Sequence, residues 1–189
     1  MTLYRTVDPA GEPVTLADAK AQLRIAHDSE DALISGLIKA ARAEVEAQTG
    51  MALIDQSWRL AMDFWPYSGV VRLRRHPVKE ILSVTVYGAE GEAAILDPAG
   101  YEADLVSRPA RLHFMAPPAP ERRLNGIEVD FVAGFGEAGT DVPDQLRRAV
   151  LLLTAYWYEI RAGHGTVGRP SSIPSGFDRL IAGYRTGRL

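Results

Sequence analysis

The sequence predicts an α+β fold: a small helical core of two N-terminal helices and one long C-terminal helix, with an inserted antiparallel β domain and a C-terminal arm. Apolar residues recur at helical spacing up to residue 50, alternate with period 2 across the middle of the chain, and return to helical spacing after residue 143. The expected parts are an N-terminal helical part at 1–52, a β region at 53–140, a core helix at 141–162, and a linker with an anchoring arm at 163–189.

Two helices are expected in the first fifty residues. Thr15 and Asp18 fit a capping box, in which two side chains accept hydrogen bonds from free backbone N–H groups of the first turn, so the first helix spans about 16–26. A second apolar stripe at three- and four-residue spacing predicts a helix over 30–49. Gly50 then suits the left-handed conformation that ends many helices.

The middle of the chain is predicted to form half-buried antiparallel strands, because apolar and polar residues alternate in four stretches. The segment 88–92 predicts a hairpin turn, and the segments 97–100 and 116–120 predict loops. The residues expected to face the core are Trp58, Leu60 and Met62; Val71 and Leu73; Leu82, Val84 and Val86; and Ile127, Val129 and Phe131.

A long helix is expected between Pro143 and Ala162. Proline suits the first turn, where the backbone N–H has no helical partner. Within 149–158, Thr154 is the one polar residue, so every side of this helix needs cover from the sheet, the first helices or another subunit. The side chains expected at the core or at an oligomer contact are Leu146, Val150, Leu153 and Trp157.

The end of the chain combines a linker with a short amphipathic helix. Nine of the 14 residues in 163–176 are Gly, Pro or Ser, and residues 161–189 carry five basic residues and one acid, against a net charge of −3 for the whole chain. An apolar face follows the linker, at positions Phe177, Leu180, Ile181 and Tyr184. This helix could bind a partner as an anchoring arm, or it could fold back on its own domain.

The composition excludes several kinds of site. The chain of 189 residues has no cysteine, which excludes a disulfide framework, a thiol nucleophile and any cysteine-based metal site. No run of 18 apolar residues predicts a membrane-spanning helix. The N-terminus lacks the apolar stretch of a secretory signal, so we expect assembly inside the cell and no membrane partner.

Motifs that could carry chemistry are isolated. Gly134, Gly136 and Gly139 match a dinucleotide fingerprint literally, but the following helix does not open at these glycines and no acidic partner follows on a second parallel strand. A strand-to-helix loop is the favoured interpretation. The four histidines are far apart, and no serine-nucleophile elbow occurs. We therefore expect no catalytic, cofactor-binding or metal-ligating residue, and no enzyme.

Nucleic-acid contact has little support in the sequence. The first two helices could form a helix-turn-helix, but the second helix carries acids beside its bases where a reading helix needs bases and amides. Arg72, Arg74, Arg75 and Lys79 form a basic cluster around a strand edge. Such a cluster could protect the edge from pairing or contact nucleic acid passing nearby.

A family resemblance rests on short segments that lie in order along nearly the whole chain. They are Val14–Arg24, Ile38–Glu46, Thr49–Gly50, Leu53–Trp58, Leu73–Val78, Tyr87 before the turn at Gly91, Ala133–Gly136, Val142–Pro143, Leu146–Arg147 with Ala149, Tyr158–Arg161, Ile173–Phe177 and Leu180–Arg185. Their order and spacing resemble the head–tail connector (adaptor, head-completion) family of tailed phages, prophages and gene transfer agents.

The resemblance implies a ring, usually a dodecamer, that docks beneath the portal protein, continues the DNA channel without sequence-specific binding, and offers a platform to the next neck or tail-completion protein. It implies a place in the virion or phage-like particle, assembly in the host bacterial cytoplasm, and no cofactor. The residues then expected to bind the portal are Ile173, Pro174, Phe177, Leu180, Ile181, Tyr184 and Arg185.

Two other functions stay open from the residues alone. A small DNA-binding or regulatory module would use the N-terminal helix pair, and an unrecognised hydrolase ranks behind it. Mass in solution together with electron microscopy separates these readings, because a ring favours the connector, whereas a salt-sensitive, sequence-selective DNA complex favours the regulator.

Overall fold

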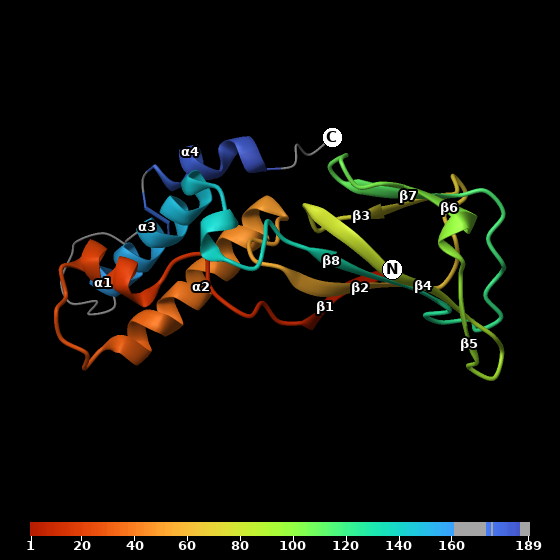
Figure 1. Cartoon of the computed structure of the whole chain (residues 1–189), viewed down its shortest axis with the longest axis horizontal. Helices are drawn as coiled ribbons and strands as arrows, with labels where there is room; N and C mark the ends of the chain where they lie inside the picture. The colour runs from red at the N-terminus through yellow and green to blue at the C-terminus, as the bar shows by residue number, and fades with distance from the viewer. Residues whose placement is uncertain (161–172, 175, 186–189) are drawn as a thin grey trace. The chain divides into compact units, whose positions relative to one another are not determined.

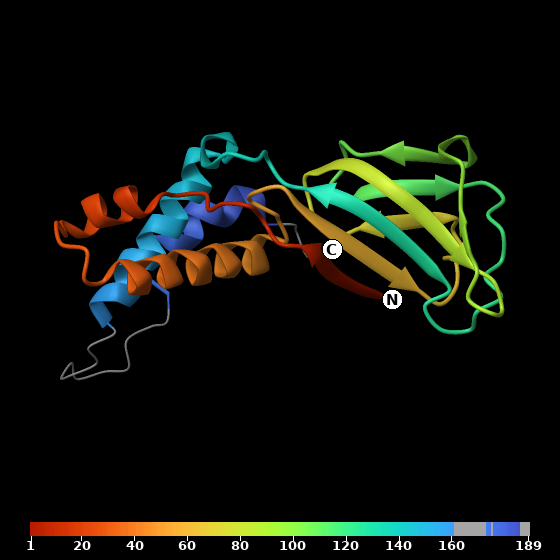
Figure 2. The same cartoon turned by 60° about the horizontal axis from the view of Figure 1, so that its bottom comes forward.

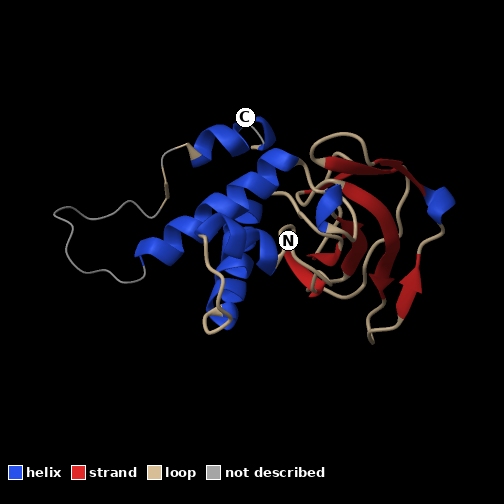
Figure 3. Cartoon of the chain, turned by 60° about the vertical axis from the view of Figure 1, so that its left-hand side comes forward, coloured by secondary structure: helices blue, strands red, loops and turns tan. Residues whose placement is uncertain are grey.

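The computed structural model describes residues 1–160, 173–174 and 176–185 (Figure 1). The chain forms two compact units, and Figure 3 shows strands in one and helices in the other. The β unit contains Met1–Ala10 and Asp55–Phe135, and the helical unit contains the remaining described residues. The predicted α+β class, with an antiparallel β domain inserted into a helical core, is confirmed.

The helical unit begins with the expected capping box. The Thr15 hydroxyl accepts from the Asp18 N–H, and the Asp18 carboxylate accepts from the Thr15 N–H, both at 3.0 Å. Gly50 ends the second helix with a φ of 73°, as predicted. The helices are α1 (Leu16–Leu23), α2 (Asp31–Thr49), α3 (Asp144–Ile160) and α4 (Phe177–Ile181), with 3₁₀ turns η2 (Gly139–Asp141) and η3 (Ala182–Tyr184).

Helix α3 is the centre of this unit and packs against α1, α2 and α4. Its side chains Leu146, Val150 and Leu153 are fully buried, together with Ile34 and Val45 of α2. Trp157, which was expected inside with them, is only half-buried. The second half of α3 is therefore less deeply buried than its first half.

A buried ion pair lies inside the helical unit. Arg42 and Glu46, one turn apart on α2, are 7% and 4% exposed. The guanidinium donates to Glu46 Oε2 at 3.1 Å and to Glu12 Oε2 at 2.8 Å, and Glu46 Oε1 accepts the Leu53 N–H at 2.9 Å. Burial alone would lower the pKa of Arg42, but the hydrogen bond and charge of Glu12 and the charge of Glu46 outweigh it and raise that pKa.

The β unit consists of two antiparallel sheets (Figure 2). The larger sheet has the order β1-β2-β8-β4-β5 and the smaller sheet the order β3-β7-β6. The strands are β1 (Thr2–Val7), β2 (Gln56–Met62), β3 (Val70–Leu73), β4 (Val78–Tyr87), β5 (Ala93–Ile95), β6 (Tyr101–Asp104), β7 (Ala110–Phe114) and β8 (Ile127–Ala133), with a 3₁₀ turn η1 (Pro98–Gly100) before β6.

The predicted inward faces are correct at every position but one. The residues that are buried as expected are Trp58, Leu60, Met62, Val71, Leu73, Val84, Val86, Ile127, Val129 and Phe131. Leu82 is 49% exposed, because the register of β4 against β8 shifts between Ile81 and Ser83. Such a bulge adds one residue to a strand and turns its side chain off the alternation.

The sequence patterns did not predict β1, β5, β6 or β7. Residues 2–7 carry no apolar alternation, and five of the six are exposed, yet β1 pairs with β2 over Thr2–Val7. The N-terminal ten residues therefore belong to the β unit, whereas the sequence division placed them with the helices. An edge strand is held by backbone hydrogen bonds, which any sequence without proline can supply.

Gly134 marks the end of β8 and requires glycine. Its φ is 157°, and an added Cβ would lie 2.5 Å from the backbone N and Cα of Asp55. Its own N–H donates to the Pro77 carbonyl at 3.0 Å, so the backbone cannot move away without losing that bond.

We expect Gly134→Ala to lower the free energy of unfolding by about 1–3 kcal/mol, because it adds a backbone clash to a strained conformation. Gly36→Ala is the matched control: Gly36 is exposed within α2 with nothing within 4 Å of the added carbon, so alanine should stabilise by about 0.5–1 kcal/mol. Urea unfolding of both variants measures the two changes in the free energy of unfolding. Equal unfolding midpoints for the two variants would contradict the conclusion that position 134 requires glycine.

Glu46→Ala should destabilise the protein by about 3–5 kcal/mol, because it removes one partner of a buried pair and leaves the Leu53 N–H without its acceptor. Glu44→Ala, two residues away on α2, removes a half-buried carboxylate whose one partner among the described residues is Gln48, and should cost less than about 1 kcal/mol. Thermal and urea unfolding compare the two, and a cost for Glu46→Ala no larger than for Glu44→Ala would show that the pair is not structural.

Candidate functional site

The C-terminal helix is folded onto the chain's own helical unit. Helix α4 packs against α3, and its side chains Phe177 and Ile181 are fully buried there. The Phe177 N–H donates to the Pro174 carbonyl at 3.3 Å, which starts the helix. The free apolar arm expected from the sequence is thus replaced by the other possibility considered, a helix that folds back.

The remaining predicted portal-binding residues lie at the surface of α4 and beside it. Ile173, Pro174, Leu180 and Tyr184 are half-buried, and Arg185 is exposed. The Arg185 guanidinium donates to Gln48 Oε1 of α2 and to Asp178 Oδ1 of α4, each at 2.6 Å. These two bonds hold the end of the helix in place. The portal-binding role of the seven residues stays a prediction, and the burial of two of them limits it to the other five.

A shallow groove runs between α3 and α4. Its lining combines two arginines with two leucines: Gln145, Arg148 and Leu152 from α3, and Gly176, Arg179 and Leu180 from the start of α4. Arg148 donates to Gln22 Oε1 at 2.9 Å, while Arg179 is exposed. The groove therefore offers apolar contacts and positive charge together, a combination suited to a protein surface that carries acids.

The glycine motif has a structural explanation. The α3 helix opens at Asp144, well after the last glycine, so its N-terminal amides do not meet the loop. A Cβ on Gly136 would lie 2.0 Å from the Asp141 carboxylate, and one on Gly139 would lie 2.8 Å from the Pro13 carbonyl. Close packing thus accounts for both glycines.

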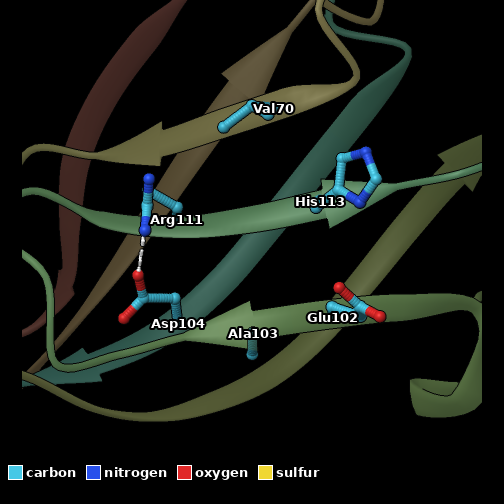
Figure 4. A pocket seen from close by; sticks show the side chains of 6 residues that line it. All are labelled: Val70, Glu102, Ala103, Asp104, Arg111 and His113. Atoms are coloured by element: carbon cyan, nitrogen blue, oxygen red, sulfur yellow. Dashed lines mark hydrogen bonds and ion pairs between the residues drawn. The ribbon is translucent and has the colours of Figure 1, made fainter.

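The histidines do not converge. His76 is 1% exposed, and neither ring nitrogen has a hydrogen-bond partner among the described residues; burial, and then the charges of Arg108 and Arg75, lower its pKa. His113 lies in an open pocket on the outer face of the small sheet with Glu102 and Arg111 (Figure 4). Among residues 1–160 and the described part of the C-terminus, no group of three potential ligands could hold a metal ion.

No described helix is long and apolar enough to span a bilayer.

Phe177→Ala should lower the free energy of unfolding by about 3–5 kcal/mol, because the whole ring is buried against the helical unit. Leu180→Ala, on the same helix but half-buried, should cost clearly less. Urea unfolding followed by circular dichroism compares the two. If the two variants unfold alike and close to the wild type, the docked position of α4 is incorrect.

Comparison with known proteins agrees with the fold. Residues 13–87 match the family model of the phage gp6-like head-tail connector protein. No curated protein matches the sequence. Three solved chains are each 29% identical, and each alignment covers 100% of this chain and 97% of the other. They come from the neck of an empty gene transfer agent particle (TM-score 0.82), the virion of a native particle (0.85), and the neck of a native particle (0.79).

The two neck structures were computed with C6 and C12 symmetry. The family match covers α1 and α2 of the helical unit and β2, β3 and β4 of the β unit, and the likeness to the solved chains extends over the whole length. The chain is therefore similar over residues 13–87 to phage gp6-like head-tail connector proteins, and over its whole length to chains of gene transfer agent particles.

Proposed function

We propose that this protein is a structural component of the neck of a phage or phage-like particle, where copies form a ring beneath the portal, continue the DNA channel and carry the next neck or tail protein. The observation that carries the proposal is the full-length likeness to chains from the neck and virion of gene transfer agent particles. The C6 and C12 symmetry of those necks supports a ring of repeated copies, with twelve as the expected number.

A structural rather than enzymatic role fits the side chains. The described residues offer no group that could hold a metal ion, and close packing explains why glycines stand at the positions of the glycine motif. Similar solved chains come from the necks of gene transfer agent particles. The groove between α3 and α4 is the surface that we assign to the portal, because it combines apolar and basic side chains on an ordered scaffold.

Docking through an ordered helix costs less than docking through a free arm. Fixing a flexible backbone costs about 1–2 kcal/mol per residue, and α4 is already held by Phe177, Ile181 and the two bonds of Arg185. Each contact can then be weak, because a ring of identical contacts on a ring of sites gains from effective concentration.

The test is attachment to portal-containing heads that lack this protein. The wild type should add a ring below the portal, seen by electron microscopy. Leu180→Ala combined with Arg179→Ala should reduce the number of bound copies per head at least tenfold, while circular dichroism shows a folded protein.

Tyr67→Ala, a fully exposed position in the β unit, is the control and should attach normally. Normal attachment of the α4 variant would move the portal contact elsewhere. A wild type that never joins heads, and instead forms a sequence-selective DNA complex as a monomer, would overturn the proposed function.

A further inference from the structure

The two flanks of the β unit carry opposite charge. The edge strands of the larger sheet are β1 and β5, and those of the smaller sheet are β3 and β6. A groove lined by Met1 and Leu3 beside Arg72 and Arg74 places the β1 and β3 edges next to each other. The short connection over residues 96–100 places the β5 and β6 edges together on the opposite flank.

The basic flank is formed by β1 and β3. Arg72 and Arg74 are exposed, and neither forms an ion pair with any residue that the structure describes. Arg5 and Arg75 lie over the same indole ring, with guanidinium carbons 6.0 and 4.5 Å from the centre of Trp58. Four arginines therefore gather at this edge, and one of them, Arg5, forms an ion pair with Asp8.

The acidic flank is formed by the β4–β5 turn and by β6. Residues 88–107 contain five acids and no lysine or arginine. Four of these acids are exposed, and the fifth, Asp104, accepts from Arg111 at 2.5 Å. The acids are Glu90, Glu92, Asp97, Glu102 and Asp104. Figure 4 shows Glu102 on β6, on the outer face of the small sheet.

Both flanks also expose apolar side chains beside the charges. Met1 is 67% exposed on the basic flank, and Ile95 and Val106 are 72% and 92% exposed on the acidic flank. Apolar contacts inside a frame of complementary charge are the usual anatomy of a protein interface. Copies of a β unit with one such surface on each flank can associate head to tail.

We propose that the basic flank of one copy docks against the acidic flank of the next, and that this contact between β units joins neighbours in the ring. The inference rests on the proposed function, because it assumes that copies assemble in a ring. Opposite charges fix the direction and register of the contact, and like flanks repel, which disfavours two-fold dimers. DNA would account for the basic flank alone and would leave the acidic flank unexplained.

Charge reversal tests the contact on portal-containing heads. One variant carries Arg72→Glu and Arg74→Glu, and a second carries Glu90→Lys and Glu102→Lys. Each alone should add at least tenfold fewer copies per head than the wild type. A one-to-one mixture should restore the ring, because every interface then joins reversed to reversed or native to native flanks. The even copy number in C6 or C12 allows this alternation.

The control reverses two positive charges in the helical unit, with Lys39→Glu and Arg24→Glu, both exposed and without ion pairs among the described residues. It should assemble like the wild type. Circular dichroism and melting establish that every variant is folded before assembly is scored.

A second measurement uses the absence of cysteine in the chain. Thr2→Cys on β1 and Ile95→Cys on β5 place two thiols at opposite edges of a five-stranded sheet, roughly 19 Å apart at the usual strand spacing. A bismaleimide shorter than this distance cannot join them within one copy. In assembled rings it should give a ladder of multimers, and either single-cysteine variant should give no ladder.

The outcomes separate the inference from the proposed function. If the wild type forms rings and both reversed variants do so equally well, or no ladder forms, the flank contact is wrong and the connector function stands. A different result would overturn the inference: only the basic-flank variant fails to assemble, the mixture does not restore the ring, and the particles retain less DNA. The basic flank would then bind DNA. If the wild type itself never assembles on heads, the proposed function fails first.

Discussion

The buried pair of Arg42 and Glu46 is the interaction on which the helical unit depends. Glu46 accepts the N–H of Leu53, just before the chain leaves this unit, and Arg42 holds Glu12, just after the chain first enters it. One pair of side chains on α2 thus fixes both ends of the segment that builds α1 and α2. Burying two charges costs several kcal/mol, and this cost is offset here because Arg42 donates to both glutamates and both carboxylate oxygens of Glu46 accept a hydrogen bond.

The β unit places its charges where they cannot disturb its core. The inward faces of both sheets are apolar, while the outer face of the large sheet carries a ladder in which Arg59 binds Asp130 at 2.7 Å and Glu128 at 2.9 Å. The hydrogen bond of Asp130 raises the pKa of Arg59, and the Glu128 carboxylate, which accepts from the Tyr87 hydroxyl, raises the pKa of that tyrosine. Arg72 and Arg74 on the basic flank and the four exposed acids on the acidic flank stay outside this ladder. They are therefore the charges available to a neighbour.

The position of α4 changes how docking is understood. A sequence of amphipathic spacing after a Gly, Pro and Ser linker suggests an arm that orders only when it binds. With Phe177 and Ile181 already buried against the helical unit, the surface that we propose for docking is a composite of α3 and α4. Such a preformed surface gives up less entropy on binding, and its strength rests on shape and charge more than on buried area.

The sequence by itself determined the elements whose signals are local. Thr15 with Asp18 indicated the hydrogen-bonded cap of α1, and Gly50 indicated the left-handed residue that ends α2. The alternation in β2, β3 and β8 indicated which face of each strand is buried. The order of short motifs also indicated a resemblance to head–tail connectors, and the match of residues 13–87 to that family model agrees with it. Side-chain periodicity is enough for these features, because it reflects which face leaves water.

Tertiary structure decided the features that depend on a distant partner. Residues 2–7 form the strand β1 because they pair with β2. Leu82 turns outward because a bulge against β8 interrupts the alternation of β4. In the sequence, Glu46 cannot be told from a surface acid. In the structure, its carboxylate accepts hydrogen bonds from the Arg42 guanidinium and the Leu53 N–H. The apolar face of α4 likewise indicated that another surface covers it, but it did not indicate which surface. The partner turned out to be the chain's own α3, because periodicity records that a face is buried and carries no information about which surface buries it.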